Sequence, residues 1–287
     1  MTHQDESATE HRDAFPPHPD FARGAVAQPD VYAQAEQDRP GFWAAQARDL
    51  LTWRTPFTRT VDTSDAPFVR WFDDGTLNVA ENCLDRHVRA GNGDRVAIHF
   101  EGEPGDRRDI TYAELTADVQ RAANVLLDLG VGVGDRVVIY MPLVPEAVVA
   151  MLAVARIGAV HSVVFGGFSA ESLRARIEDA GAKVVVTADG GWRKGAVAPL
   201  KPAVDEALAG AGTASVEHVL VVRRGGNEVA WHDGRDLWWH ETVATASAEH
   251  EAPAFPAEQP LFILYTSGTT GRPKGCLLYT SPSPRDS

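Results

Sequence analysis

Cysteine, long apolar runs and positive charge are all scarce in this sequence of 287 residues. The 2 cysteines, Cys83 and Cys276, cannot build a disulfide framework, and no cysteine or histidine pair has the spacing of zinc ligands. No segment approaches the roughly 18 uncharged apolar residues that a membrane-spanning helix needs. The first residues lack the basic and apolar regions of a signal peptide. We therefore expect a cytoplasmic protein that does not bind membranes.

Acidic residues outnumber basic ones by 40 to 27, which gives a formal net charge of -13. This excess disfavours binding to nucleic acids and to anionic lipids, although it leaves room for a local basic pocket. With 44% hydrophobic residues, the chain can bury a sizeable core. The composition thus predicts a globular protein of one large or two modest domains that binds no nucleic acid.

The sequence pattern divides the chain into four regions. Residues 1–37 are rich in Asp, Glu, His, Pro and Ala with little apolar periodicity, so we expect a mobile acidic arm. Residues 38–93 begin with helical spacing and continue in short elements. Residues 94–275 form the main α/β region. Residues 276–287 are predicted to be a non-native tail.

Apolar runs of strand length alternate with helical patterns from residue 94 onward. The runs are Val96–Phe100, Arg136–Met141, Ala159–Phe165, Lys183–Ala188, Val219–Val222 and Leu261–Tyr265. A capping box of Thr111 and Glu114 begins the first helix, and Pro145 and Ser169 suit the starts of the next two. Continuous apolar runs are typical of parallel strands that are covered on both faces. The sequence therefore predicts an α/β fold of layered, right-handed βαβ units.

The segment after the last predicted strand is a candidate phosphate-binding loop. Its glycines, hydroxyl side chains and lysine are Thr266, Ser267, Gly268, Thr269, Thr270, Gly271 and Lys274. Successive amides in a glycine-rich loop form an anion-binding concavity, and hydroxyl and ammonium groups add donors for phosphate oxygens. The alternative is a flexible polar turn, but the preceding buried strand favours a polyphosphate site. Pro273 and Gly275, which flank the lysine, exclude a Walker A loop.

Tyr265–Gly275 resembles the signature loop of AMP-forming adenylating enzymes, which include acyl-CoA synthetases, luciferases and the adenylation domains of peptide synthetases. Upstream blocks resemble those of the acetyl-CoA synthetases, namely Trp71-Phe72, Leu77–His87, His161–Ser169 and Asp236–His240. The resemblance covers about residues 40–275 in the family's order. It implies the layered large N-terminal domain of these enzymes, incomplete and without the C-terminal lid domain.

The resemblance implies an acetate–CoA ligase with acetate, ATP and coenzyme A as substrates. In this family acetate and ATP form acetyl-adenylate and pyrophosphate, and coenzyme A then displaces AMP. The candidate loop would hold the ATP phosphates, and Mg²⁺ would share in offsetting the repulsion between carboxylate and phosphate. A propionate or other short-chain ligase is the alternative within the family. A non-catalytic nucleotide- or CoA-binding module is the alternative outside it.

Two upstream segments resemble the coenzyme A site of the family. The first matches the stretch that receives the adenine and consists of Phe165, Gly166 and Gly167. In the second, Arg193 matches an arginine that pairs with the 3′-phosphate, a contact that suits a forked guanidinium. Ala196 stands where the family often has a second basic residue, and Lys194 is the candidate substitute. The alternative for the first segment is a core aromatic followed by a turn at the end of a strand. The alternative for Arg193 and Lys194 is a solvated pair on the surface.

Several other conspicuous side chains are interpreted as structural. Asn78 can cap a helix whose inner face carries Cys83, so this cysteine is expected in the core. His87 and His161 have no partners at metal-ligand spacing. Trp238-Trp239-His240 is expected to serve in packing rather than as a ligand platform.

The chain departs from the family pattern after Gly275. The family continues with an apolar residue, soon a histidine, and a helix, whereas this chain reads Cys276-Leu-Leu-Tyr-Thr-Ser-Pro-Ser-Pro and resembles a translated sequencing-library adapter. The family's acetate pocket, adenine site, magnesium site and catalytic lysine lie downstream of this point. We therefore expect no catalytic or metal-binding residues in this fragment and no activity from it alone. We also expect the strand ending at Tyr265 to lack neighbours and to expose apolar surface.

Overall fold

The computed structural model describes residues 16–266 and 274–280, and the chain forms two compact units, Met1–Ala47 and Arg48–Ser287. The described part of the first unit consists of α1 (Pro19–Gly24), α2 (Pro29–Gln37) and most of α3 (Arg39–Leu50). The sequence pattern indicated little regular structure before residue 38, yet two helices form there. A proline in the first turn of each explains this, because its fixed φ suits a helix start and its missing N–H would have no partner. Neither helix buries a residue, and the mobility of the arm remains a prediction.

The second unit begins with short elements. Two antiparallel pairs are β1 (Val61–Asp65) with β2 (Phe68–Trp71), and β3 (Thr76–Leu77) with β13 (Phe255–Pro256). The π-helical segments η1 (Glu81–Asp85) and η2 (Val88–Asn92) follow β3 in the chain. Asn78 accepts a hydrogen bond from the Glu81 amide at 3.2 Å, which confirms it as a helix cap. The expectation of a core Cys83 is wrong because its side chain is exposed. A wider π turn brings different positions to the inner face than the α-helical spacing assumed.

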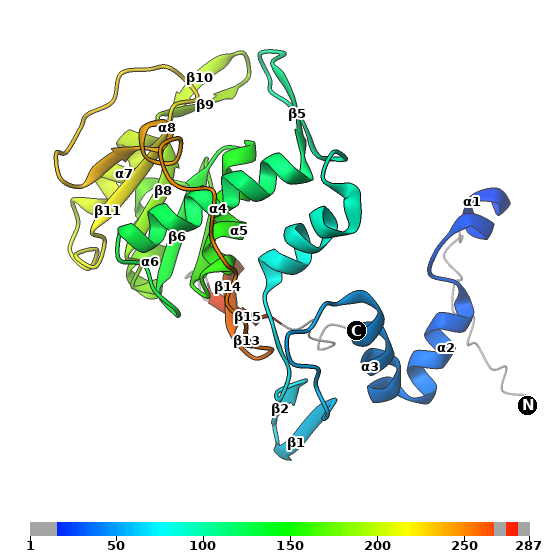
Figure 1. Cartoon of the computed structure of the whole chain (residues 1–287). Coiled ribbons are helices and arrows are strands. Elements are labelled where there is room, and N and C mark those ends of the chain that lie inside the picture. The colour runs from blue at the N-terminus through cyan, green and yellow to red at the C-terminus, as the bar shows by residue number, and fades with distance from the viewer. Residues whose placement is uncertain (1–15, 267–273, 281–287) are drawn as a thin grey trace, which may run out of the picture. The chain divides into compact units, whose positions relative to one another are not determined.

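A seven-stranded sheet forms the centre of this unit (Figure 1). Its order is β12-β11-β8-β6-β7-β14-β15, and all neighbouring pairs are parallel except β14 with β15. The strands are β6 (Arg136–Met141), β7 (Val160–Phe165), β8 (Val184–Ala188), β11 (His218–Val222), β12 (Asp236–Trp238), β14 (Pro260–Thr266) and β15 (Lys274–Tyr279). The predicted α/β class with a parallel sheet is therefore confirmed.

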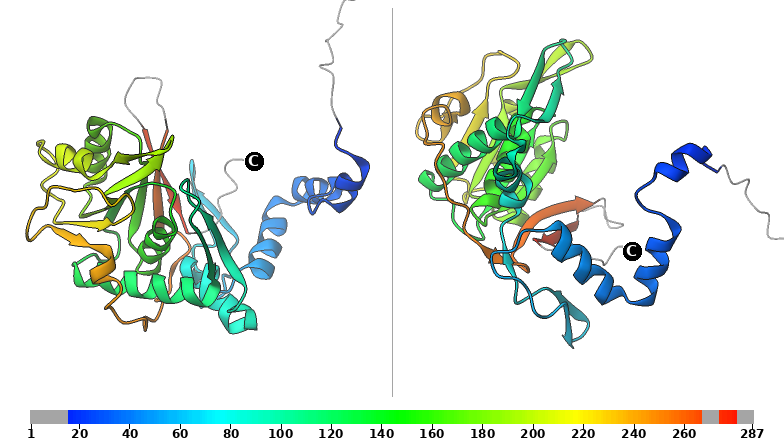
Figure 2. Two further views of the ribbon diagram at one scale, coloured as in Figure 1. Left: turned by 90° about the horizontal axis from the view of Figure 1, so that it is seen from above. Right: turned by 45° about the vertical axis from the view of Figure 1, so that its right-hand side comes forward.

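Helices cover both faces of the sheet. They are α4 (Tyr112–Asp128), α5 (Pro145–Arg156), α6 (Ala170–Ala180), α7 (Lys201–Leu208) and the short α8 (Trp239–Thr242). The connection from β6 through α5 to β7 runs one way along the sheet, whereas those through α6 and α7 run the other way. Because such crossovers are right-handed, α5 and the α6–α7 pair lie on opposite faces. Figure 2 shows the strands between these two helical layers.

The predicted helix starts are confirmed. Thr111 and Glu114 form the full capping box, with distances of 3.2 Å and 2.8 Å for the two reciprocal bonds to backbone amides. Pro145 occupies the first turn of α5, and the Ser169 side chain accepts from the Ser172 amide at 3.3 Å. None of the helices in the described ranges is long and apolar enough to cross a bilayer.

Two antiparallel hairpins stand apart from the main sheet. One pairs β4 (Val96–Glu101) with β5 (Arg107–Thr111), so the first predicted strand of the α/β region does not join the central sheet. The other pairs β9 (Gly190–Arg193) with β10 (Ala196–Pro199). Figures 1 and 2 show the tips of the two hairpins next to each other.

The far edge of the sheet exposes apolar side chains. The expectation that the strand ending at Tyr265 lacks neighbours is wrong, because β14 pairs with β7 on one side and with β15 on the other. The expectation of exposed apolar surface is confirmed, since Leu264 is 49% and Val163 is 42% exposed. Pairing satisfies the backbone of a strand without covering its faces. Residues of the predicted tail up to Tyr279 take part in this pairing.

Candidate functional site

A cavity of about 600 Å³ lies at the carboxyl ends of the central strands. Its wall consists of residues that follow β6, β7 and β8, together with Arg224 after β11 and the β4–β5 hairpin. The connections after β6 and β8 leave toward opposite faces of the sheet, which makes this a topological switch point. Ligands of open α/β sheets bind in the crevice at such a point. The cavity is therefore the candidate ligand site of the described chain.

The turn after β7 supplies an aromatic ring and open backbone to this cavity. The Phe165 side chain is 57% exposed although it ends a central strand, and its ring meets that of Phe168 edge to face, with 6.0 Å between centroids. A Cβ at Gly166 would lie 2.8 Å from the carbonyl oxygen of Met141. A Cβ at Gly167 would lie 2.9 Å from the Phe165 ring. The backbone contact at Gly166 requires glycine, and the exposed Phe165 ring is available for stacking with a planar ligand.

The β9–β10 hairpin supplies a cationic group from another side. Arg193 pairs with Ala196 across a two-residue turn of Lys194 and Gly195, whose φ angles are +55° and +77°. This is the backbone of a tight hairpin turn, in which glycine suits the second position. Arg193 lines the cavity, whereas Lys194 occupies the exposed turn and does not. The structure thus brings the predicted residues Phe165, Gly166, Gly167 and Arg193 together and leaves Lys194 outside.

The β4–β5 hairpin closes the cavity on a further side with Phe100–Glu103. It is held by an ion pair in which the Arg224 guanidinium donates to both carboxylate oxygens of Asp106, at 2.7 and 2.9 Å. The same guanidinium lies 5.5 Å from the centroid of the Phe100 ring. The Glu103 carboxylate accepts a hydrogen bond from the Gly195 amide. These contacts join two hairpins and one loop that are distant in the sequence.

A buried carboxylate holds the loops around the cavity in place. Asp189 follows β8 directly, is 1% exposed and accepts hydrogen bonds from four backbone amides. The donors are Gly190, Arg224, Gly225 and Gly226, at 2.7 to 2.8 Å. Charge-assisted bonds of this kind are strong and offset the cost of burying the carboxylate. Asp189 therefore positions both the β9 strand that carries Arg193 and the loop that carries Arg224.

Sequence reasoning missed Asp189, Arg224 and the tip of the β4–β5 hairpin, which carries Glu103 and Asp106. A signal for the first two was present, because each comes directly or almost directly after a predicted parallel strand. The carboxyl ends of such strands meet at one edge of the sheet, where ligands bind. The hairpin tip had no such signal, since its place at the cavity depends on contacts with distant loops.

The predicted phosphate loop lies mostly outside the described residues, and this applies to Ser267, Gly268, Thr269, Thr270 and Gly271. Its two ends are described. Thr266 ends β14, Lys274 begins β15, and the two residues pair across the antiparallel strands. The antiparallel pairing of β14 with β15 therefore places the Lys274 backbone beside the end of β14.

An arginine connects the base of this loop with the cavity. The Arg176 guanidinium lies 5.3 Å from the ring centroid of Tyr265 and 4.9 Å from that of Phe168. The Tyr265 hydroxyl donates to the carboxylate of Asp179 at 2.6 Å. Burial and this carboxylate both raise the pKa of Tyr265. The phenol therefore stays neutral near pH 7 and holds the end of β14 against α6.

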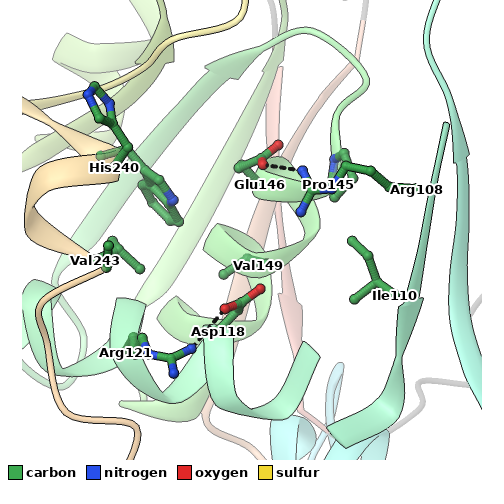
Figure 3. Close-up of a pocket in the computed structure, with 11 residues that line it drawn as sticks. Arg108, Ile110, Asp118, Arg121, Pro145, Glu146, Val149, His240 and Val243 are labelled. Carbon is green, nitrogen blue, oxygen red and sulfur yellow. Dashed lines mark hydrogen bonds and ion pairs between the residues drawn. The ribbon is translucent and has the colours of Figure 1, made fainter. Parts of the chain in front are cut away.

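A smaller cavity of about 320 Å³ lies between β5, α4, α5 and α8 (Figure 3). Arg108 donates to the Glu146 carboxylate at 2.8 Å, and Arg121 donates to the Asp118 carboxylate at 3.0 Å (Figure 3). Burial raises the pKa of Asp118. Because Arg108 and Arg121 are both paired with carboxylates of the chain, this cavity offers a ligand little unpaired charge. Trp239 at its base is buried, as expected for a packing residue.

The sequence resemblance implies Mg²⁺ as a partner of the ATP phosphates. Within residues 16–266 and 274–280, no group of three or more His, Cys, Asp and Glu side chains is arranged to hold a metal ion. Mg²⁺ requires several oxygen ligands in near-octahedral geometry. The described part of the chain thus supplies no cluster of side chains that would hold this ion by itself.

Comparison with known proteins gives two matching family models. The model described as AMP-binding enzyme matches residues 84–281, and the model described as acetyl-coenzyme A synthetase N-terminus matches residues 28–83. The chain is similar to an acetyl-coenzyme A synthetase of Streptomyces coelicolor, with 64% identity over 267 residues. It is also similar to the proteins of that name from Mycobacterium tuberculosis, with 60% identity over 277 residues, and Thiobacillus denitrificans, with 57% over 275 residues.

These alignments cover 93 to 96% of this chain but only 40 to 42% of the relatives. The chain thus spans about two fifths of the length of the curated relatives that it matches. The AMP-binding model alone matches well over half of the chain. The chain belongs to the AMP-binding enzyme family, within which it resembles the N-terminal part of acetyl-coenzyme A synthetases.

Proposed function

We propose that this chain is the N-terminal part of an AMP-forming acetate–CoA ligase and that the cavity at the carboxyl ends of its central strands receives the 3′-phosphoadenosine of coenzyme A. One observation carries this proposal. The exposed Phe165 ring, the open backbone of Gly166 and Gly167, and the Arg193 guanidinium converge on one cavity at the switch point of the sheet. The names of the relatives support the choice of acetate over other acids. A propionate or other short-chain ligase is the alternative.

The cavity offers the two kinds of contact that a phosphorylated adenosine needs. An adenine can stack on the Phe165 ring, and the glycines beside it let the ligand approach the backbone. A guanidinium such as that of Arg193 binds phosphate through two parallel hydrogen bonds. We assign CoA binding to Phe165, Gly166, Gly167 and Arg193. Lys194 stays a secondary candidate because its turn is adjacent to the cavity but not part of its wall.

For the whole enzyme, we propose that the loop from Thr266 to Lys274 holds the ATP phosphates. The acetate carboxylate then attacks the α-phosphorus, and pyrophosphate leaves. In the second half-reaction the CoA thiol attacks the acyl carbon of the adenylate, and AMP leaves. Both steps need positioned partners, and effective molarity is lost when positioning groups are missing. We therefore expect this chain to bind ligands without catalysing either step, and we retain cytoplasmic location as a prediction.

Calorimetric titration of this chain with coenzyme A tests the assignment of the cavity. Arg193→Ala is expected to weaken CoA binding by about tenfold or more, the effect of losing a charge-assisted hydrogen bond. Lys194→Ala removes the same charge one residue further along the hairpin turn and is expected to weaken binding much less. Equal affinities for the wild type and Arg193→Ala would contradict the assignment.

An acetate-dependent exchange of label between ATP and pyrophosphate tests for activity. We expect no exchange by this chain above the level of its Lys274→Ala variant. Exchange by the wild type alone would show that the first half-reaction needs fewer residues than proposed. A longer chain that includes the downstream residues can be assayed in the same way. If it also binds CoA or ATP tightly and shows no exchange, a non-catalytic binding module is favoured.

A further inference from the structure

The tip of the β4–β5 hairpin places a carboxylate at the turn of the β9–β10 hairpin. Glu103 accepts a hydrogen bond from the backbone amide of Gly195. Gly195 belongs to the two-residue turn that directly follows Arg193, and both Glu103 and Arg193 line the cavity at the carboxyl ends of the central strands. Figures 1 and 2 show the two hairpin tips side by side. The contact joins residues 92 positions apart in the sequence.

The turn has the chemistry of an anion site. Its left-handed backbone, with positive φ at Lys194 and Gly195, presents an amide N–H beside two cationic side chains, Arg193 and Lys194. An amide donor next to guanidinium and ammonium groups is a recurrent arrangement for binding anions. In this structure the anion at the Gly195 amide is the chain's own Glu103 carboxylate.

The acidic residue is kept at this place by the rest of its hairpin. Asp106, three residues further along, receives both hydrogen bonds from the Arg224 guanidinium. Arg224 in turn has its amide held by the buried carboxylate of Asp189 at 2.7 Å. The ion pair therefore keeps the backbone that carries Glu103 close to the turn.

We infer that Glu103 determines how strongly this end of the cavity binds phosphate. Its carboxylate competes with a ligand phosphate for the Gly195 amide, in the turn beside the cavity wall, and for the field of Arg193 in that wall. The identity of the ligand as a 3′-phosphoadenosine rests on the proposed function. Glu103 is then a specificity residue that restrains the affinity for the phosphorylated ligand. Removal of its charge should strengthen phosphate binding, an unusual direction for a change in a binding site. When the Glu103 carboxylate is neutralised, its screened repulsion of the phosphate is lost. For two exposed charges that lie close together, this loss changes the affinity several-fold.

Titration with inorganic phosphate tests this role without reference to coenzyme A. The amide resonance of Gly195 in ¹⁵N-labelled protein reports on the turn itself. Glu103→Gln is expected to bind phosphate several-fold more tightly than the wild type at low salt, and Glu103→Lys more tightly still. Glu206→Gln, a matched charge change at an exposed position of α7, is expected to leave the affinity unchanged. Unchanged or weaker phosphate binding in both Glu103 variants would overturn the inference.

A second titration compares coenzyme A with its form that lacks the 3′-phosphate. Glu103→Gln is expected to raise the preference for the phosphorylated form several-fold, while affinity for the dephosphorylated form stays near its original value. An equal gain for both forms would place the effect of Glu103 elsewhere in the cavity and overturn the inference. If the wild type binds neither form, the proposed function fails, and the phosphate titration still decides whether Glu103 occupies an anion site.

Discussion

The Asp106 carboxylate and the Arg224 guanidinium, 118 positions apart in the sequence, form a two-bonded ion pair that connects the β4–β5 hairpin to the loop after β11. The hairpin is not part of the central sheet, so contacts of this kind set its position. Two residues of the hairpin then line the cavity, namely Phe100, whose ring lies against the guanidinium, and Glu103, whose carboxylate lies at the β9–β10 turn. The ion pair thus holds the hairpin that forms one wall of the cavity.

Loss of this ion pair should change ligand binding more than stability. For Arg224→Ala we expect a small decrease in melting temperature, because Asp106 is exposed and exposed pairs stabilise little. We expect CoA affinity to fall a few-fold because the wall is no longer held. Arg107→Ala, which breaks the exposed contact with Glu101 on the same hairpin, serves as the control for both calorimetry and thermal unfolding. A large loss of stability with unchanged affinity would contradict this assignment.

Asp189 should be among the most sensitive positions for folding. Asp189→Ala leaves four backbone amides of two loops without their acceptor in a buried place, at a cost of about 3 kcal/mol. Asp189→Asn retains one acceptor oxygen and should lose less. Urea unfolding of both variants measures this difference, with the exposed Asp233→Ala as the control. A loss below about 0.5 kcal/mol for Asp189→Ala would show that water replaces the carboxylate easily.

Local patterns in the sequence were enough to locate five of the central strands, β6, β7, β8, β11 and β14, and the helices α4, α5 and α6, whereas β12, β15 and α7 were not predicted. The capping box at Thr111, the proline of α5 and the Ser169 cap are short-range signals, and each appears at the expected helix start. The turn after β7 could also be anticipated, since Phe165 to Gly167 follow a continuous apolar run. Their convergence with Arg193 follows from the parallel arrangement, which places strand ends at one edge.

What the sequence could not indicate depends on contacts between distant segments or on small changes of helical pitch. The direction of Lys194 is decided by the turn of a hairpin whose strands are too short to show a period. Cys83 turned outward because a π-helical segment replaced the assumed α-helical spacing. The pairing of β15 with β14 needs the antiparallel return of a segment that the family pattern did not describe. In each case the conformation depends on geometry or contacts that a local sequence pattern does not contain.

Gly166→Ala should damage the candidate site through the backbone. The added Cβ would lie 2.8 Å from the carbonyl oxygen of Met141, and a backbone atom in a central strand cannot move aside cheaply. Overpacking of this kind costs about 1–3 kcal/mol, and displacement of the turn should lower CoA affinity about tenfold. Gly132→Ala is the control, because its Cβ would meet nothing closer than 3.8 Å. Thermal unfolding and calorimetric titration check the two effects, and wild-type affinity for Gly166→Ala would contradict the assigned turn.

His161 should make the folded state sensitive to mild acid. Its ring stacks on Phe262 with 5.3 Å between centroids, Nδ1 has no hydrogen-bond partner among the described residues, and burial lowers the pKa to about 4. The unfolded chain therefore binds a proton near pH 6.5 that the folded chain accepts only near pH 4, so stability falls as the pH drops through this window. His161→Phe keeps the stack and removes the proton site, and its stability relative to the wild type should rise by about 3 kcal/mol between pH 7 and pH 4. Urea unfolding at several pH values measures this difference, with the exposed His240→Phe as the control. A difference that stays constant with pH would show that the His161 imidazole is protonated as easily in the folded chain as in the unfolded one.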